Sequence, residues 1–85
     1  MLTATFTITW PDGHRATARI EAVSAEAEYP VQYEGATDRI MDPPARSDVP
    51  FLGFAMRQTA ERTGGRFSQD FVGAYDLQAG GKEGL

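Results

Sequence analysis

The 85-residue sequence contains no cysteine, only one histidine and only one lysine. Without cysteine the chain forms no disulfide, no thiolate nucleophile and no thiolate metal site. One histidine and scattered carboxylates do not make a closed zinc site, and no acidic stretch has the spacing of a calcium-binding loop. We therefore expect neither a metal ion nor a cofactor.

Long hydrophobic runs are also lacking. The longest covers only a few residues, which is too short for a helix that crosses a membrane. Residues 1–5 have neither the basic region nor the continuous apolar region of a signal peptide. A small protein without disulfides fits a reducing compartment better than secretion. These features favour a single small cytoplasmic domain with no membrane partner.

Basic residues are outnumbered by acidic ones, eight to twelve, which gives a formal net charge of −4. The excess lies in residues 21–42, where Arg39 is the only basic residue. Nucleic-acid affinity rests on basic contacts, so we expect no direct nucleic-acid binding. An acidic segment can instead attract a basic partner protein, unless its carboxylates only solvate the surface. The candidate acidic contact residues are Glu21, Glu26, Glu28, Glu34, Asp38 and Asp42.

Residues 2–10 alternate between apolar side chains and threonine. This period of two is typical of a strand with one buried face. Pro11-Asp12-Gly13 follows and predicts a three-residue hairpin turn. A second strand that begins after this turn would place Ile8 opposite Ala16 and Phe6 opposite Ala18. The register predicts a hairpin with one apolar face, where large side chains meet alanine, and one polar face of threonine, arginine and glutamate.

Tyr29, Val31 and Tyr33 alternate with polar residues or proline and predict a third strand over residues 29–34. Pro30 cannot donate to a ladder, so this strand belongs at an edge. Residues 36–48 are typical of a loop, which we expect Ile40 and Met41 to anchor to the core.

A helix is predicted from about Val49 to Thr63. Asp48 is a good N-cap, and Gly64-Gly65 is typical of a helix C-terminus. Gly53 inside the helix predicts a close approach to the sheet, because it carries no side chain. The predicted buried stripe consists of Leu52, Ala55, Met56, Thr59 and Ala60.

Residues 66–77 predict a last strand, with Phe67, Phe71, Tyr75 and Leu77 on one face. The chain is thus predicted to form one α+β domain over residues 1–77, with a flexible tail over 78–85. Its order is β-β-β-α-β, with a small antiparallel sheet and one helix packed on one face. The threonine face then remains open to solvent or to a partner.

Catalysis would have to use His14, the only histidine, which lies at the mouth of the predicted hairpin beside Asp12. None of the three serines lies in a nucleophile motif. We expect His14 to stack on Trp10 or to cap the turn, and we expect no enzymatic activity.

Aromatic residues offer a second type of contact. Tyr29 and Tyr33, together with Trp10 and Tyr75, are candidates for an aromatic anchor at a binding surface. The alternative is that they pack in the core, since a small domain needs its aromatic side chains inside.

We expect the protein to be a non-enzymatic acidic module that binds a basic partner protein. One concrete form is an inhibitor encoded by a phage or mobile element, which would occupy the nucleic-acid-binding surface of a host complex. Two alternatives remain open. The chain could be a structural subunit of a homo-oligomer, such as a homodimer, that pairs through its exposed sheet face. It could also be a small ligand binder or enzyme that uses His14.

Overall fold

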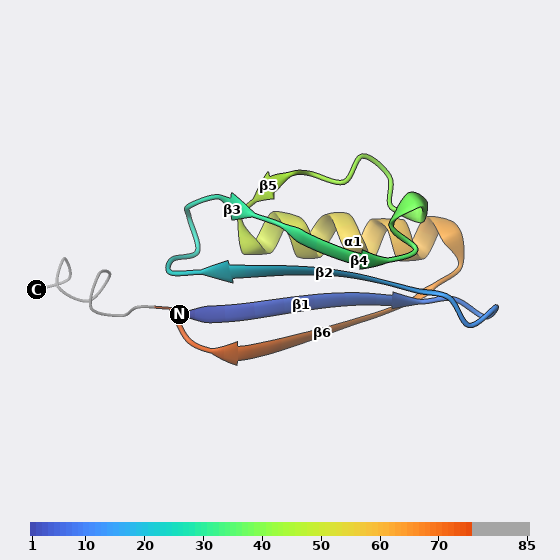
Figure 1. The fold of residues 1–85 in the computed structure, drawn as a ribbon, viewed down its shortest axis with the longest axis horizontal. Coiled ribbons are helices and arrows are strands. Elements are labelled where there is room, and N and C mark those ends of the chain that lie inside the picture. Colours follow the sequence, from blue (N-terminus) through green and yellow to red (C-terminus); the bar gives the residue numbers. More distant parts are fainter. Residues whose placement is uncertain (76–85) are drawn as a thin grey trace, which may run out of the picture.

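The computed structural model of the protein describes residues 1–75. The tail predicted over residues 78–85 and the residue Leu77 of the last predicted strand lie outside the described residues. The described chain forms a four-stranded antiparallel sheet with one helix packed on one face (Figure 1). The predicted α+β class and the single covered face are therefore confirmed.

The hairpin of β1 (Leu2–Thr9) and β2 (Arg15–Ala22) has the predicted register. Phe6 lies opposite Ala18 and Ile8 opposite Ala16. The turn closes where the Trp10 N–H donates to the His14 carbonyl at 2.9 Å. Because the side-chain period of a strand is two, this register puts every large apolar residue of β1 on the helix-covered face.

The third strand is divided, which corrects the prediction of one strand over residues 29–34. β3 (Tyr29–Pro30) pairs with β5 (Arg46–Ser47) in a separate small sheet, and only β4 (Gln32–Gly35) pairs with β2. Between them the Val31 N–H donates to the Ala45 carbonyl at 2.9 Å. Pro30 has no N–H to donate, so the chain changes partners at this point.

The segment predicted as a loop over residues 36–48 contains two short elements, the 3₁₀ turn η1 (Thr37–Arg39) and the strand β5. Ile40 is buried, as predicted. Met41 is 48% exposed, so the expectation that it anchors the loop to the core is wrong.

The helix α1 (Val49–Thr63) has the predicted bounds. Its N-terminus is capped where the Phe51 N–H donates to Asp48 Oδ1 at 2.7 Å. It ends at Gly64, whose φ of 75° is the left-handed conformation that glycine adopts without steric cost. Four of the five residues of the predicted stripe are buried, while Ala55 is partly exposed.

The last strand, β6 (Arg66–Gly73), lies on the far side of β1, so the strand order is β4-β2-β1-β6. It ends at Gly73, short of the predicted end at residue 77. Phe67 and Phe71 pack against the ring of Phe6, with ring centroids 6.1 and 5.9 Å apart. The predicted inward face of this strand is thus correct, although Phe71 stays 48% exposed at the rim.

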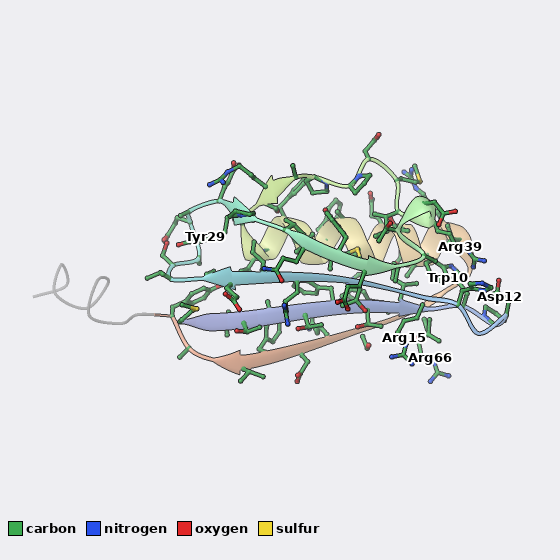
Figure 2. All side chains as sticks on the ribbon, in the orientation of Figure 1. Trp10, Asp12, Arg15, Tyr29, Arg39 and Arg66 are labelled. Carbon is green, nitrogen blue, oxygen red and sulfur yellow. The ribbon has the colours of Figure 1, made fainter. Side chains whose placement is uncertain are left out.

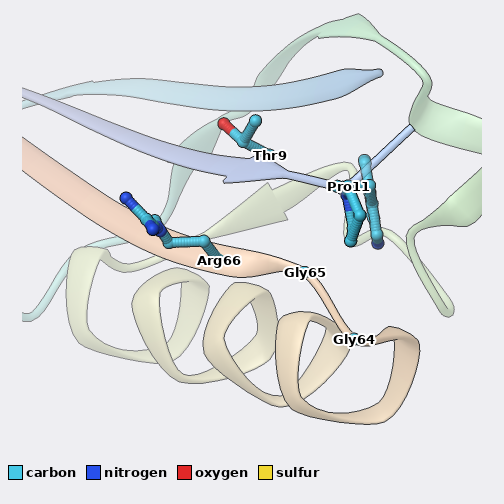
Figure 3. A pocket seen from close by; sticks show the side chains of 6 residues that line it. Thr9, Pro11, Gly64, Gly65 and Arg66 are labelled. Carbon is cyan, nitrogen blue, oxygen red and sulfur yellow. The ribbon is translucent and has the colours of Figure 1, made fainter. Parts of the chain in front are cut away.

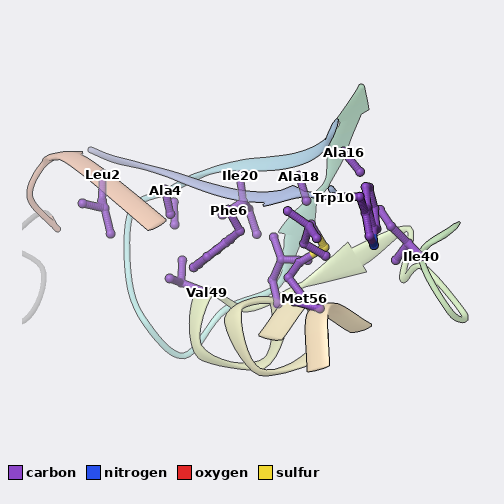
Figure 4. Close-up of a cluster of buried hydrophobic side chains, with 14 residues drawn as sticks. Leu2, Ala4, Phe6, Trp10, Ala16, Ala18, Ile20, Ile40, Val49 and Met56 are labelled. Carbon is purple, nitrogen blue, oxygen red and sulfur yellow. The ribbon is translucent and has the colours of Figure 1, made fainter. Parts of the chain in front are cut away.

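The core lies between the sheet and α1 (Figure 4). Phe6, Ile8 and Ile20 from the hairpin are almost fully buried and meet Leu52 and Met56 from the helix. A Cβ added to Gly53 would lie 3.0 Å from the Phe6 ring, which confirms the predicted close approach. Fully burying each large apolar side chain contributes roughly 1.5–3 kcal/mol, so this layer provides most of the stability.

Gly65 is the tightest point between the end of α1 and the hairpin. A Cβ at this residue would overlap Ile8 Cγ2 and would lie 2.9 Å from Trp10 Nε1. We expect Gly65→Ala to lower the free energy of unfolding by about 1–3 kcal/mol through overpacking. Gly64→Ala is the control, because its Cβ meets open space and only its positive φ is unfavourable, at about 1 kcal/mol. Urea denaturation measures both variants, and a Gly65→Ala protein as stable as the wild type contradicts this packing.

Candidate functional site

The acidic segment 21–42 forms one long side of the molecule, on the opposite side of the sheet from β6 (Figure 1). It comprises the end of β2, the turn before β3, then β4 and η1, and finally the start of the loop to β5. We call its six carboxylate residues the acidic edge. They are Glu21, Glu26, Glu28, Glu34, Asp38 and Asp42.

All six residues of the acidic edge are exposed. Within residues 1–75, both contacts of 4 Å or less between a carboxylate oxygen and a nitrogen of an arginine, lysine or histidine side chain belong to Asp12, which contacts Arg39 and the His14 ring. The carboxylates of the acidic edge therefore have no cationic side chain within that distance in the described part of the chain. Their charge is compensated by solvent and remains available to a cationic surface.

The structure brings these residues onto one side but not into one compact cluster. Glu26 and Glu28 lie near one end of β2, beside Tyr29, whereas Asp38 lies next to Arg39 at the other end. Figure 2 shows Tyr29 and Arg39 at opposite ends of the sheet. Eight residues of strand span roughly 25 Å. The acidic edge is thus a strip rather than a single patch.

The open sheet face, which α1 does not cover, is electrically balanced. The strand registers place three arginines and three carboxylates on it, and Arg19 donates to Gln32 Oε1 at 2.6 Å. The excess negative charge therefore belongs to the four acidic-edge carboxylates outside the strands, in the turns and loops beside β4, rather than to the open face. They are Glu26, Glu28, Asp38 and Asp42. The charged residues of the open face are Arg15, Arg19, Arg66, Glu21, Glu34 and Asp70.

The two candidate tyrosines hold the acidic edge in place. The Tyr29 hydroxyl accepts a hydrogen bond from the Ser24 N–H at 3.0 Å, and hydrogen bonding with Ser24 holds the pKa of this phenol below its usual value. The Tyr33 hydroxyl donates to the Pro44 carbonyl, and burial raises the pKa of Tyr33. Both rings are half-buried. Their hydroxyls fix the turn before β3 and the proline loop.

A cluster that the sequence analysis did not predict fixes the other end of the acidic edge. The Arg39 guanidinium lies 4.8 Å from the centroid of the Trp10 ring, and its Nη2 is 2.7 Å from Asp12 Oδ2. Figure 2 shows these three side chains together at the end of the hairpin. Cation–π and ion-pair contacts thus attach η1, and with it Asp38, to the hairpin. Arg39 and Asp12 are 27 residues apart, so no local pattern indicates the contact.

Trp10 itself belongs to the core, which decides between the two interpretations of this aromatic residue. It is 4% exposed, and its Nε1 donates to Thr63 Oγ1 at 2.9 Å. Thr63 in turn donates to the Thr59 carbonyl. The ring therefore joins the hairpin to the last turn of α1 rather than facing a partner.

Arg39 lies over the Trp10 ring, whereas the His14 side chain contacts Asp12. The His14 Nδ1 is 3.2 Å from Asp12 Oδ1, and the His14 backbone N–H donates to the same oxygen at 3.0 Å. The His14 side chain is 62% exposed. The turn is capped by the Asp12 side chain, which accepts the bond from the His14 backbone N–H, and not by the His14 side chain as expected.

The hollows on the surface are shallow and open. One of about 430 Å³ lies beside Trp10 and is lined by Thr9, Pro11, Gly64, Gly65 and Arg66 (Figure 3). Its lining holds one charged group, and no acid and base converge in it. Among residues 1–75 no three His, Cys, Asp or Glu side chains gather closely enough to hold a metal ion. In that same range no helix has the length and apolar character needed to span a membrane.

Comparison of the chain with protein-family models, with curated proteins and with solved structures gives no match. The interpretation of the acidic edge therefore rests on its own geometry and charge.

The bond between Arg39 and Asp12 predicts a dependence of stability on pH. Hydrogen bonds from Arg39 and from the His14 backbone hold the pKa of Asp12 far below its ordinary value of 3.8. A carboxylate whose pKa is lower in the folded state than in the unfolded state stabilises the fold when the pH is above the unfolded-state pKa. This contribution to the free energy of unfolding is lost as the pH falls toward the folded-state pKa. We expect the stability difference between wild type and Asp12→Asn, measured by urea denaturation, to shrink steadily below about pH 4.

The control for this measurement is Glu61→Gln, an exposed acid on α1 with no ion pair in the described chain. This variant makes the same change from acid to amide without removing a bond to Arg39, and its stability is measured over the same pH range as the baseline. A difference for Asp12→Asn that follows this baseline would show that the Asp12 carboxylate does not support the hairpin end.

Proposed function

We propose that the protein is a non-enzymatic binding module that docks its acidic edge on a basic surface of another protein. The observation that carries this proposal is that six exposed carboxylates lie along one side without a cationic partner within residues 1–75. Complementary charge steers association and fixes the orientation of a complex.

The rigidity of the scaffold supports the proposal. Hydrogen bonds of the Tyr29 and Tyr33 hydroxyls hold the backbone at one end and in the middle of the acidic edge. The ion pair of Arg39 with Asp12 holds its other end. A surface that is already ordered loses little conformational entropy when it binds. The carboxylates can therefore contribute to affinity without first ordering a loop.

The form of the acidic edge favours a partner whose basic surface binds nucleic acid. A strip of carboxylates along β4 and its flanking turns presents negative charge to arginine and lysine much as a phosphate backbone does. This protein would then occupy the basic surface of the partner in place of nucleic acid. We propose, as the specific form, an inhibitor encoded by a phage or mobile element that acts in this way on a host complex.

The proposal is tested by capture of host proteins on the immobilised full-length chain at low and high ionic strength. We expect the retained protein to carry a basic surface, to elute as salt rises, and to be displaced by added double-stranded DNA. Glu28→Lys and Glu34→Lys should each weaken its retention by about tenfold, since each reverses a charge on the acidic edge.

Glu61→Lys is the matched control, because it changes the net charge by the same amount at an exposed position on α1. It should retain the partner much more strongly than the two acidic-edge variants. Docking through the acidic edge is contradicted if retention of the partner does not depend on salt concentration. It is also contradicted if all three charge reversals weaken that retention equally.

A further inference from the structure

The strand β6 is an eight-residue edge with one side paired and the other free of any partner in the described chain. Natural proteins protect such edges with lysine, proline or a bulge. Between Arg66 and Gly73 the sequence has no lysine and no proline, and its pairing with β1 is continuous. This edge is therefore open to a further strand.

The backbone groups available on this edge follow from the ladder with β1. The Ala74 N–H donates to the Met1 carbonyl beside the opposed residues Leu2 and Gly73. This bond identifies Leu2 and Gly73 as a non-hydrogen-bonded pair of the antiparallel ladder. Hydrogen-bonded and non-hydrogen-bonded pairs alternate along such a ladder, and the backbone N–H and C=O groups of a non-hydrogen-bonded pair point away from the partner strand. The N–H and C=O groups of Phe67, Gln69 and Phe71 therefore point away from β1.

Apolar side chains accompany these free backbone groups. Phe71 is 48% and Val72 62% exposed at the end of β6, and Phe54 on the adjacent face of α1 is 56% exposed. A groove of about 410 Å³ runs between helix and strand, with Phe54, Gln69 and Phe71 in its lining. Arg57 also lines this groove, and its guanidinium lies 4.4 Å from the centroid of the Phe67 ring, so the groove is mainly but not wholly apolar. An exposed, mainly apolar groove beside an unpaired edge is a typical site of protein association.

We propose that this edge binds a second copy of the same chain, so that the two β6 strands pair antiparallel about a twofold axis at Gln69. In this register Gln69 faces itself, and Phe67 faces Phe71 of the second copy on the helix side of the sheet. All three residues have their free N–H and C=O groups directed at the partner strand. Aromatic pairs across strands add to the stability of such a ladder.

Charge complementarity supports a second copy as the occupant. β6 carries one arginine and one aspartate, Arg66 and Asp70, and both lie on the open sheet face. In the proposed register Asp70 lies opposite Ser68 of the second copy and diagonal to two of its residues, Asp70 and Arg66, whose long side chain can reach this carboxylate. The twofold axis repeats the contact between Asp70 and Arg66, so each aspartate has one arginine within reach and the two paired strands carry no net charge.

Neighbouring registers are less favourable. A shift of the axis to Asp70 would place two aspartates directly opposite each other, which is destabilising. A shift to Ser68 would place Asp70 directly opposite Arg66, but it would shorten the ladder to residues 66–70 and would leave Phe71 opposite Gly65, which precedes the strand. If the register slipped by one residue, each residue with free N–H and C=O groups would lie opposite a residue whose groups already bond to β1. Side chains of the helix-covered face would then lie opposite side chains of the open face.

The resulting dimer would have one continuous eight-stranded sheet with both helices on the same face, and the exposed Phe54 and Phe71 would be covered at the seam. Because β4 and β6 are opposite edges of the sheet, the two acidic edges would lie at the outer ends. The inference does not rest on the proposed function, since it uses neither the acidic edge nor its partner.

The test is sedimentation equilibrium of the full-length protein over a dilution series. We expect a dimer that dissociates by mass action. Asp70→Arg and Arg66→Asp should each weaken dimerisation by about tenfold or more, since each places like charges on the paired strands. An equimolar mixture of the two variants should recover a dimer, because both arginines of the first variant then meet aspartates of the second.

Thr7→Glu is the control variant, because Thr7 lies at the centre of the open sheet face, between Thr17 and Ser68. It should leave the edge dimer intact. The proposal is overturned by a wild type that is monomeric at every concentration, or by a dimer that neither single β6 variant weakens. It is also overturned by a mixture that associates no better than its components, or by dissociation in Thr7→Glu alone, which would indicate pairing through the sheet face.

Discussion

The structure depends on one steric match within the hairpin. Large side chains of β1 lie opposite alanines of β2, as in the pairs of Phe6 with Ala18 and Ile8 with Ala16. The small residues leave room for α1 to approach the sheet, and Gly53 and Gly65 let the helix and its C-terminal turn come closer still. A protein interior tolerates neither voids nor overlap, so this match sets the position of the helix and, through it, of β6.

One helix cannot cover more than one face of a four-stranded sheet, and this limit creates all the surfaces on which function could rest. The open face carries balanced charge, the β4 side carries the acidic edge, and the outer side of β6 has no partner strand among residues 1–75. These surfaces differ in chemistry. The partner proposed for the acidic edge is a cationic protein, and the partner proposed for the β6 edge is a second copy of the chain. Because the two edges lie on opposite sides of the sheet, these two proposed contacts would not compete.

The elements that could be predicted are those whose signals are local. The turn Pro11-Asp12-Gly13 and the alternation on both sides of it specify the hairpin, and the caps at Asp48 and Gly64 specify the helix. The division of the third strand could not be predicted, because the bond from Val31 to Ala45 joins segments with no common pattern. The candidate carboxylates were found by composition, but their arrangement as a strip, and the tyrosine and arginine contacts that hold it, required the fold.

The sequence by itself determined most of the secondary structure, the buried faces of the hairpin and helix, and the excess of acidic residues in one segment. Periodicity, turn chemistry and charge act over a few residues and can be read along the chain. Only the tertiary structure decided that Arg39 stacks on Trp10, that β6 lies at an edge beside β1, and which carboxylates lack a partner in the described residues. These outcomes depend on contacts between residues far apart in the chain, which form only when the helix has been placed against the sheet.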